Sequence, residues 1–224
     1  MKLSVIVPVL NEERVLPRLL RGLEVLRRSG VEVIVVDGGS ADGSQALVVS
    51  AGIALVCAMR GRAQQMNAGA ATAFGDVLLF LHADTRLPDG AKGLIDAALT
   101  GNRHVWGRFD VRLDGVGWRL RVVAAAMNVR SRLTGIATGD QAIFARRSVF
   151  ERVGGFPLQP LMEDIELSRR LRAISRPVCI RARAVTSARR WESRGVGRTI
   201  VLMWWLRFAY WCGVSPERLA RRYQ

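Results

Sequence analysis

The chain has 224 residues, of which 50% are hydrophobic, so it can form one domain with a sizeable buried core. No apolar run reaches the ~18 residues that a membrane span needs, and the N-terminus lacks the pattern of a secretory signal. The cysteines lie far apart and are odd in number, which argues against a disulfide framework or a zinc cluster. These features predict a globular, cytoplasmic protein.

The net charge of +15 arises entirely in the second half of the chain. Residues 1–100 hold ten Lys and Arg and ten Asp and Glu, whereas residues 101–224 hold twenty-four and nine. A strongly basic half indicates acidic partners: the phosphates of a nucleotide, anionic lipid headgroups or nucleic acid. Charge alone does not choose among these three.

The first hundred residues alternate between strand and helix patterns. Residues 3–9 form a β-branched run in which Pro8 predicts the end of strand pairing. Asn11 then predicts the N-cap of a helix, whose leucines repeat every three to four residues as far as Gly30. Further elements are expected at 31–36 (strand), 45–50 (helix), 53–56 (strand), 67–73 (helix) and 77–81 (strand). This alternation favours a mainly parallel sheet with helices on both faces.

The second half is less regular. It is expected to contain strands at 106–113 and 141–145 and helices at 116–134 and 163–173, with a last short helix starting at Ser215. The helix at 163 opens with three acids, at the end that its dipole favours. Residues 199–212 are apolar and aromatic, and Arg207 is their only charged residue.

The buried strand at 77–81 ends abruptly in His82 and Asp84. On a strand, these two positions point to the same side, so both side chains can meet one divalent cation, with Asp84 as the hard oxygen ligand. Ligands collect at the carboxyl ends of parallel strands. A strand followed by an ordinary polar turn is the alternative.

Five motifs stand in a specific order along the chain. They are Ser4-Val-Ile-Val-Pro-Val-Leu-Asn-Glu-Glu13, Val35-Val-Asp-Gly-Gly-Ser-Ala-Asp-Gly-Ser44, Leu81-His-Ala-Asp84, Val153-Gly-Gly-Phe156 and Glu163-Asp-Ile-Glu-Leu167. Together they resemble the family 2 glycosyltransferases, which have the GT-A fold. The short chain, the Leu-His-Ala-Asp-Thr form and the tail at 213–219 look like a small bacterial subgroup, the selenodomain-associated or arsenosugar-type glycosyltransferases. The likeness covers nearly the whole chain.

The resemblance implies an α/β protein of the GT-A, nucleotide-diphospho-sugar transferase type. Its central sheet is mostly parallel, with helices on both faces and a C-terminal helical extension. Residues 1–100 would be the nucleotide-sugar-binding half, and residues 101–190 the acceptor-binding and catalytic half of the same domain. Residues 191–224 would form a basic loop and the C-terminal helices.

The resemblance also implies a donor site for a nucleotide-diphosphate sugar, with uridine diphosphate as the expected nucleotide. Asp37 would accept the imide N–H of the uracil ring, and Arg62 would fork onto the diphosphate. The alternative role for Glu12 is helix capping. The alternative for Arg62 is a solvated position on the surface. The implied nucleotide-binding residues are Pro8, Leu10, Glu12, Asp37, Ser40, Arg62, Asn67, Ala83 and Asp84.

His82-Ala83-Asp84 takes the place of the family's Asp-x-Asp metal motif, with histidine replacing the first acid. Asp84 is expected to hold Mn²⁺ or Mg²⁺ against the two phosphates. An imidazole ligand would favour Mn²⁺. The alternative for His82 is a hydrogen bond to ribose or phosphate without a bond to the metal.

By resemblance, Asp164 is the general base of an inverting, single-displacement transfer to an acceptor hydroxyl. Glu163 would orient the acceptor, a small molecule or a lipid, or share the proton. The alternative is that these acids serve only as charges at a helix start.

Two other functions are weighed against this one. A sugar-nucleotide nucleotidyltransferase would be expected to show a Gly-rich, Arg-containing loop after the first strand, where this chain has Pro8-Val-Leu-Asn-Glu12. A nucleic-acid or membrane-binding module would be expected to cluster lysines or exposed aromatics, whereas the charge here is mostly arginine dispersed among apolar residues. No nucleic-acid partner is therefore expected. For residues 199–212, a buried core helix, a homodimer contact and a peripheral contact with the inner face of the membrane all remain open.

Overall fold

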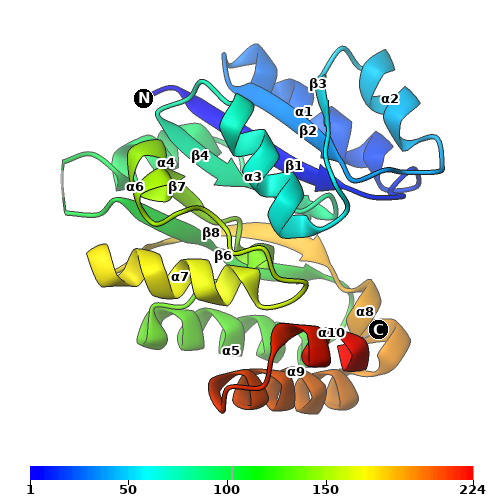
Figure 1. Cartoon of the computed structure of the whole chain (residues 1–224), viewed down its shortest axis with the longest axis vertical. Helices are drawn as coiled ribbons and strands as arrows, with labels where there is room; N and C mark the ends of the chain where they lie inside the picture. The colour runs from blue at the N-terminus through cyan, green and yellow to red at the C-terminus, as the bar shows by residue number, and fades with distance from the viewer. Residues whose placement is uncertain (102, 224) are drawn as a thin grey trace.

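The computed structural model describes residues 1–101 and 103–223, which form an α/β structure around one mixed sheet (Figure 1). Its strands are β1 (Leu3–Val9), β2 (Glu32–Asp37), β3 (Ala54–Cys57), β4 (Val77–Phe80), β5 (Thr85–Arg86), β6 (Trp106–Asp114), β7 (Phe144–Arg146) and β8 (Val178–Ser187). Its helices are α1 (Leu16–Arg28), α2 (Ser44–Ser50), α3 (Arg62–Thr72), α4 (Ala91–Ala98), α5 (Trp118–Thr134), α6 (Arg147–Arg152), α7 (Glu163–Ile174), α8 (Arg189–Arg194), α9 (Val196–Trp211) and α10 (Pro216–Tyr223), with a 3₁₀ turn η1 (Gly139–Gln141).

The strand order is β3-β2-β1-β4-β7-β6-β8-β5. The first four strands in this order are parallel, as the alternation of strands and helices predicted. β7 is antiparallel to both β4 and β6, and β5 is antiparallel to β8. The parallel sheet predicted for the first half is therefore confirmed, and the second half joins the same sheet through an antiparallel strand.

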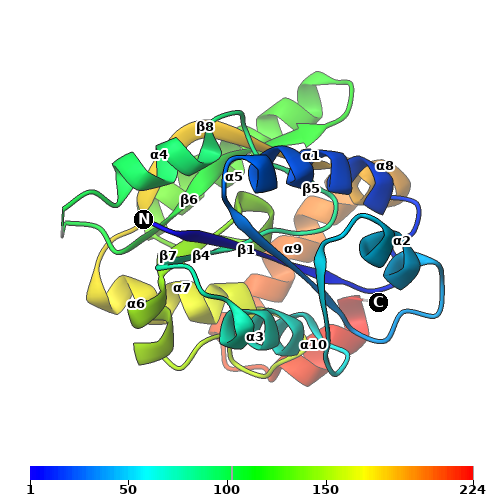
Figure 2. The same ribbon diagram turned by 90° about the horizontal axis from the view of Figure 1, so that it is seen from above.

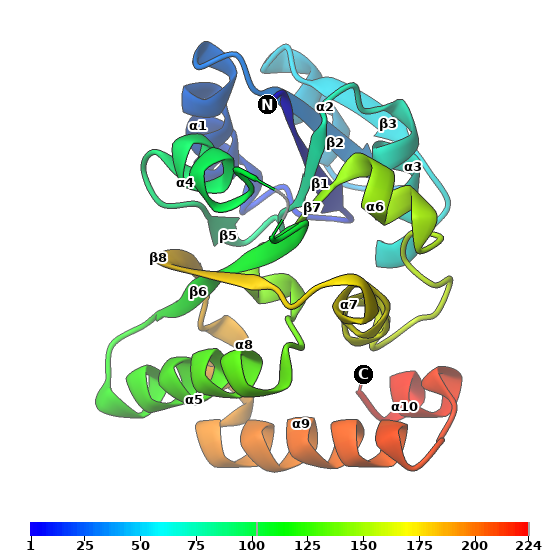
Figure 3. The ribbon, with the colours of Figure 1, turned by 90° about the vertical axis from the view of Figure 1, so that its left-hand side faces the viewer.

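Helices cover both faces of the sheet (Figures 2 and 3). On one face, α1 and α4 bury Leu16, Leu19 and Ile95 against the odd-numbered residues of β1 and β2. On the other face, α3, α6 and α7 pack against residues such as Ile6 and Phe80. Successive side chains of a strand point to opposite faces, so the continuously apolar strands β1, β2 and β4 supply both cores.

Strand pairing ends near Pro8 on one side only: β1 pairs with β4 as far as Ile6 but stays in register with β2 through Pro8 and Val36. Two other local expectations are wrong. Asn11 does not cap α1: it has a left-handed φ of 55°, and its Oδ1 accepts a hydrogen bond from the Ala41 N–H. α3 begins at Arg62, five residues before the predicted start at Asn67, so Arg62 lies in its first turn.

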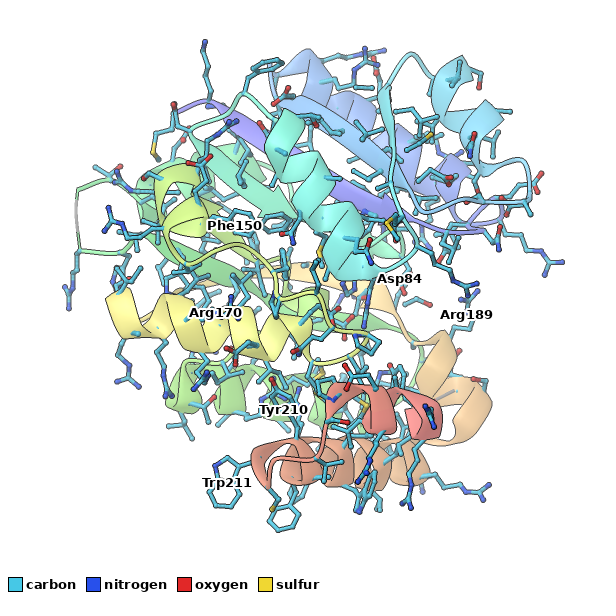
Figure 4. The ribbon with its side chains drawn as sticks, viewed as in Figure 1. Asp84, Phe150, Arg170, Arg189, Tyr210 and Trp211 are labelled. Atoms are coloured by element: carbon cyan, nitrogen blue, oxygen red, sulfur yellow. The ribbon has the colours of Figure 1, made fainter. Side chains whose placement is uncertain are left out.

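The C-terminal extension consists of helices. The segment expected as a basic loop begins with α8, and α9 and α10 follow. Leu206 and Ala209 of α9 are buried in a small core with Leu161, Met162 and Leu219. The opposite face of α9 is exposed, and Figure 4 shows Trp211 pointing away from the molecule. Among the described helices, none has the length and apolar character required for a membrane span.

Candidate active site

The candidate site lies where β1 and β4 separate. β1 pairs with β4 only as far as Ile6 but stays paired with β2 up to Val9. β2 lies on one side of β1 and β4 on the other, so the strand order reverses at the carboxyl end of β1. Such a topological switch point is where α/β sheets bind ligands. Gln65 of α3 donates hydrogen bonds to the carbonyl oxygens of Val9 and Val36 and closes the β2 side of the strand ends.

Asp84 presents an exposed carboxylate beyond the end of β4. Its Oδ1 accepts hydrogen bonds from the hydroxyls of Thr85 (3.3 Å) and Thr186 (3.4 Å). Its Oδ2 makes no hydrogen bond with any residue in the described part of the chain. The pairing of β5 with β8 brings Thr186 to this position, so a strand a hundred residues away orients the carboxylate.

His82 is turned toward η1. Its Nδ1 lies 3.4 Å from Oδ1 of Asp140, and a side chain at Gly139 would clash with its ring at Nε2. Burial opposes protonation, but the hydrogen bond to Asp140 and the negative charges of Asp140 and Asp84 together outweigh it, and the pKa of His82 is raised above its ordinary value. Both ring nitrogens therefore face the turn at 139–140 rather than open solvent.

Arg62 forms an ion pair across the site. Its Nε lies 3.0 Å from Oε1 of Glu163, whose side chain is 3% exposed. Burial raises the pKa of Glu163, and the positive charge of Arg62 offsets part of that rise. Oε2 of Glu163 is buried without a hydrogen-bond partner among the described residues. The pair joins the first turn of α3 to the first turn of α7.

Asp164 is held by two backbone N–H groups. Its Oδ2 accepts from Gly139 (2.9 Å) and its Oδ1 from Ile165 (2.8 Å). The carboxylate is half-buried and lines a cavity. Because each carboxylate oxygen has a second lone pair, both can still accept a hydrogen bond from a ligand.

Glu12 joins the same cluster from the loop after β1. Burial raises its pKa, as do the negative charges of Asp84 and Asp42, while Arg189 and His82 lower it. Figure 4 shows Asp84 and Arg189 on the same side of the molecule. The donor-side residues Glu12, Arg62, His82 and Asp84 are therefore brought together with the predicted base Asp164.

Asp37 and Ser40 lie in the turn after β2, and their polar groups bond within the turn. Asp37 is 1% exposed and accepts hydrogen bonds from Gly39 N, Ser40 N and Gln45 Nε2, and from the Ser40 hydroxyl. Burial opposes ionisation, but these donors outweigh it and lower the pKa of Asp37. In this conformation the carboxylate shapes the turn.

Asn67 of α3 bonds to the backbone of Phe156, in the loop before α7. Its Nδ2 donates to Phe156 O (2.8 Å) and its Oδ1 accepts from Phe156 N (2.9 Å), which ties α3 to the loop before α7. Of the other predicted residues, Pro8 and Ala83 are buried and Leu10 is half-buried, near the strand ends. Both polar groups of the Asn67 side chain are thus used to bind Phe156.

A cavity of about 550 Å³ extends from the charged cluster toward the C-terminal helices. Its charged end includes Arg62, His82, Asp140 and Asp164. The remainder is lined mostly by apolar side chains of α5, α7 and α9, among them Val123, Met127, Ile165, Ile200 and Met203. The site thus has a polar end and an apolar chamber.

Sequence reasoning missed two arginines that line this cavity, Arg130 of α5 and Arg207 of α9. Arg130 stands seven residues after Val123 and three after Met127, so helical spacing places it on the same face as these two apolar residues. That spacing could have identified Arg130 as a residue of this helix face. No sequence pattern points to Thr186, because its place beside Asp84 depends on the pairing of β5 with β8.

Comparison with curated proteins gives partial matches to longer chains. The undecaprenyl-phosphate 4-deoxy-4-formamido-L-arabinose transferase of Pseudomonas paraeruginosa (strain DSM 24068 / PA7) is 34% identical over 165 residues. The match covers 66% of this chain and 48% of the relative. The chain thus spans about half the length of the curated relatives it matches.

Solved structures share the fold. The mannosyltransferase PcManGT from Pyrobaculum calidifontis, in complex with GDP-Man and Mn²⁺, aligns with a TM-score of 0.62 at 23% identity, over 82% of this chain and 56% of its own. Residues 1–349 of S. aureus TarS, in complex with UDP-GlcNAc, align with a TM-score of 0.64 at 20% identity, over 84% and 58%. The predicted GT-A fold is confirmed. A model of "Glycosyl transferase family 2" matches residues 4–154, more than half of the chain, which therefore belongs to this family.

Proposed function

We propose that the protein is an inverting, metal-dependent glycosyltransferase that moves a sugar from a nucleotide-diphosphate donor, a UDP-sugar, to a hydroxyl acceptor. The observation that carries the proposal is the convergence of four acids, from three segments of the chain, on the guanidinium of Arg62. Although burial opposes its charge, the pKa of Arg62 is raised by Glu163 and Asp164 and further by Asp140 and Asp84, which come from separate segments. Donor-side and acceptor-side groups therefore share one small volume, as a single-displacement transfer requires.

Asp164 is the proposed general base. The acceptor oxygen attacks the anomeric carbon of the sugar, and the hydroxyl proton passes to the Asp164 carboxylate. The bond between the anomeric carbon and the diphosphate oxygen breaks, and its electron pair leaves with the nucleoside diphosphate. The N–H groups of Gly139 and Ile165 fix the carboxylate so that its remaining lone pairs face the cavity. Glu163, paired with Arg62, orients the acceptor or shares its proton.

The residues present fit a divalent cation held partly by the substrate. In the described part of the chain, no cluster of three or more His, Cys, Asp or Glu side chains could form a closed metal cage. Asp84, exposed and with a free Oδ2, would hold Mn²⁺ or Mg²⁺ with the donor phosphates completing the shell, a mode typical of Mg²⁺. When bound, the cation would neutralise charge on the leaving diphosphate.

His82 is assigned an orienting role. Because both of its ring nitrogens face η1, it positions the turn whose Gly139 N–H holds Asp164. Glu12, Arg62 and Arg189 then line the approach of the donor, with the two arginines available for its phosphates. Asp37 and Ser40 stabilise the conformation of the turn after β2, against which the base of the nucleotide would bind.

The acceptor is proposed to be a small molecule or a lipid. The name of a curated relative includes undecaprenyl phosphate, and this supports a lipid as the acceptor. The apolar chamber beside Asp164 supports the same class. Peripheral contact with a membrane through the exposed face of α9 is part of this proposal.

Calorimetric titration with UDP tests the donor site. We expect UDP to bind the wild-type protein with Mn²⁺ or Mg²⁺, and binding to be lost with a chelator or in Asp84→Ala. The matched control is Asp89→Ala, which removes another exposed acid five residues away. If UDP binds equally well to Asp84→Ala, or without any divalent cation, the metal assignment is wrong. If neither UDP nor a UDP-sugar binds under any of these conditions, the proposed function is wrong.

A further inference from the structure

Arg130 of α5 is half-buried, and two of its side-chain nitrogens lack a hydrogen-bond partner among the described residues. Its Nε and Nη2 are buried and make no hydrogen bond with any described residue. Burial lowers the pKa of Arg130, and the negative charges of Asp164 and Asp140 offset part of that effect. Buried N–H donors without hydrogen-bond partners are costly, and such donors commonly mark a site that an anion or water completes.

Arg207 of α9 presents a second such donor. Its Nε is also buried without a hydrogen-bond partner in residues 1–101 and 103–223. Arg207 and Arg130 line the same cavity, although they come from helices more than sixty residues apart in sequence. Two guanidinium groups that line one cavity match an anion with several oxygens, such as a phosphate, because their planar forks donate in pairs.

The rest of the cavity is unsuited to a small hydrophilic anion. Val123, Met127, Ile200 and Met203 contribute apolar walls. Trp204 lines the cavity and is also 75% exposed, and Val122 lines it and is 56% exposed. The cavity therefore reaches the surface between α5 and α9, at a place where apolar side chains meet solvent.

From these observations we infer that the acceptor is an anionic amphiphile, whose phosphate-like group binds Arg130 and Arg207 and whose apolar part fills the chamber toward Trp204. This inference rests on the proposed function, since it names the substrate class of that site. The reacting hydroxyl lies on the same molecule, between its anionic group and Asp164. The arginines act as binding residues for the acceptor and take no part in donor binding.

The test is a calorimetric titration with n-dodecyl phosphate below its micelle concentration, in the absence of nucleotide and metal. We expect the wild-type protein to bind it at least about tenfold more tightly than inorganic phosphate, which lacks the tail, or dodecyltrimethylammonium, which lacks the anion. Arg130→Met and Arg207→Met should each weaken binding about tenfold or more. Arg121→Met, an exposed arginine on α5 outside the cavity, should leave it unchanged.

Thermal melting separates binding from folding. Since two buried nitrogens of Arg130 make no hydrogen bond in the described structure, unliganded Arg130→Met should melt no lower than the wild type. Wild-type affinity in both Arg130→Met and Arg207→Met would overturn the inference, as would equally tight binding of inorganic phosphate. If Arg130→Met does not fold, Arg207→Met alone decides.

A second arm identifies the source of the amphiphile. Phosphatidylcholine vesicles containing a dialkyl phosphate present the same chemistry in a bilayer, and sedimentation with them would indicate a membrane lipid. Binding of only the monomeric dodecyl phosphate would indicate a water-soluble amphiphile. Because these titrations contain no nucleotide, a failure here leaves UDP binding to be judged separately, and loss of UDP binding leaves this result standing.

Discussion

The Nε of Arg62 lies 3.0 Å from Oε1 of Glu163, and this ion pair joins the opening turn of α3 to the opening turn of α7. Its two sides are unequal, since the Arg62 side chain is 41% exposed and that of Glu163 is 3% exposed. The arginine therefore favours the charged form of a carboxyl group whose pKa burial raises, and Glu163 holds the arginine over the site.

Arg62→Met should destabilise the protein by about 1.5–3 kcal/mol, because it leaves the buried Glu163 carboxylate without its charged partner. Glu163→Gln should recover most of this loss in the double variant. Urea denaturation of the wild type, both single variants and the double variant gives the coupling free energy. A coupling near zero would show that the pair contributes nothing to stability.

The cost of Arg62→Met should grow with pH. Burial raises the pKa of Glu163, so the folded state holds this proton to higher pH than the unfolded state and loses stability as pH rises through that interval. Removing Arg62 raises the pKa of Glu163 further. The difference in unfolding free energy between the wild type and Arg62→Met should therefore be larger at pH 8 than at pH 5. A difference that shrinks with increasing pH would contradict this assignment.

Asp164→Asn should lower the rate of sugar transfer about 10²- to 10⁴-fold with little change in UDP affinity. The substitution removes the proton acceptor but keeps the size and shape of the side chain. The rate can be followed as UDP release from a UDP-sugar, with water as the acceptor if no other is known. The matched control is Glu166→Gln in the same helix turn, where the carboxylate pairs with Arg169 and Arg170. Wild-type turnover in Asp164→Asn would exclude this residue as the base.

Asn67→Ala should destabilise the protein by about 1–3 kcal/mol, because it leaves a backbone N–H and a backbone carbonyl of Phe156 without their partners. UDP affinity should stay at the wild-type value, because the side chain is bonded to Phe156. Thermal denaturation and UDP titration of the same sample measure both quantities. A large loss of UDP affinity with unchanged stability would restore Asn67 to the nucleotide site.

Gly139→Ala should cost about 1–3 kcal/mol and lower activity, since the added methyl group would clash with the His82 ring and displace the N–H that holds Asp164. Gly93→Ala is the matched control: it lies inside α4, with open space around it, and should be stabilising by about 0.5–1 kcal/mol. Melting temperatures of the two variants should therefore move in opposite directions.

The sequence sufficed for the parts of the fold that local patterns encode. The apolar runs of β1, β2 and β4 and the leucine spacing of α1 identified the parallel half, and the placement of His82 and Asp84 after β4 followed from the same runs. Asn11 was misjudged because its side chain bonds to Ala41, thirty residues away, instead of to the start of α1. Local capping rules contain no information about such a partner.

The acceptor end of the site was the part least accessible from sequence. Arg130 and Arg207 have no motif around them, and their common role depends on α5 and α9 lining one cavity. The hydroxyl of Thr186 reaches Asp84 only because β5 pairs with β8. Groups brought together by tertiary contacts between distant segments leave no periodic pattern in one sequence.

The gap between β1 and β4 is created by backbone, since one pairing stops at Ile6 while the other runs on to Val9. Exchange of surface side chains therefore cannot remove it, but a change in chain length can. Asp84 lies in a tight turn that the Thr85 N–H closes on the His82 carbonyl oxygen (3.0 Å), so deletion of Ala83 would remove this turn and shift the Asp84 carboxylate away from the hydroxyl of Thr186. Substitutions around this crevice should be far better tolerated than insertions or deletions of a single residue between Phe80 and Asp84.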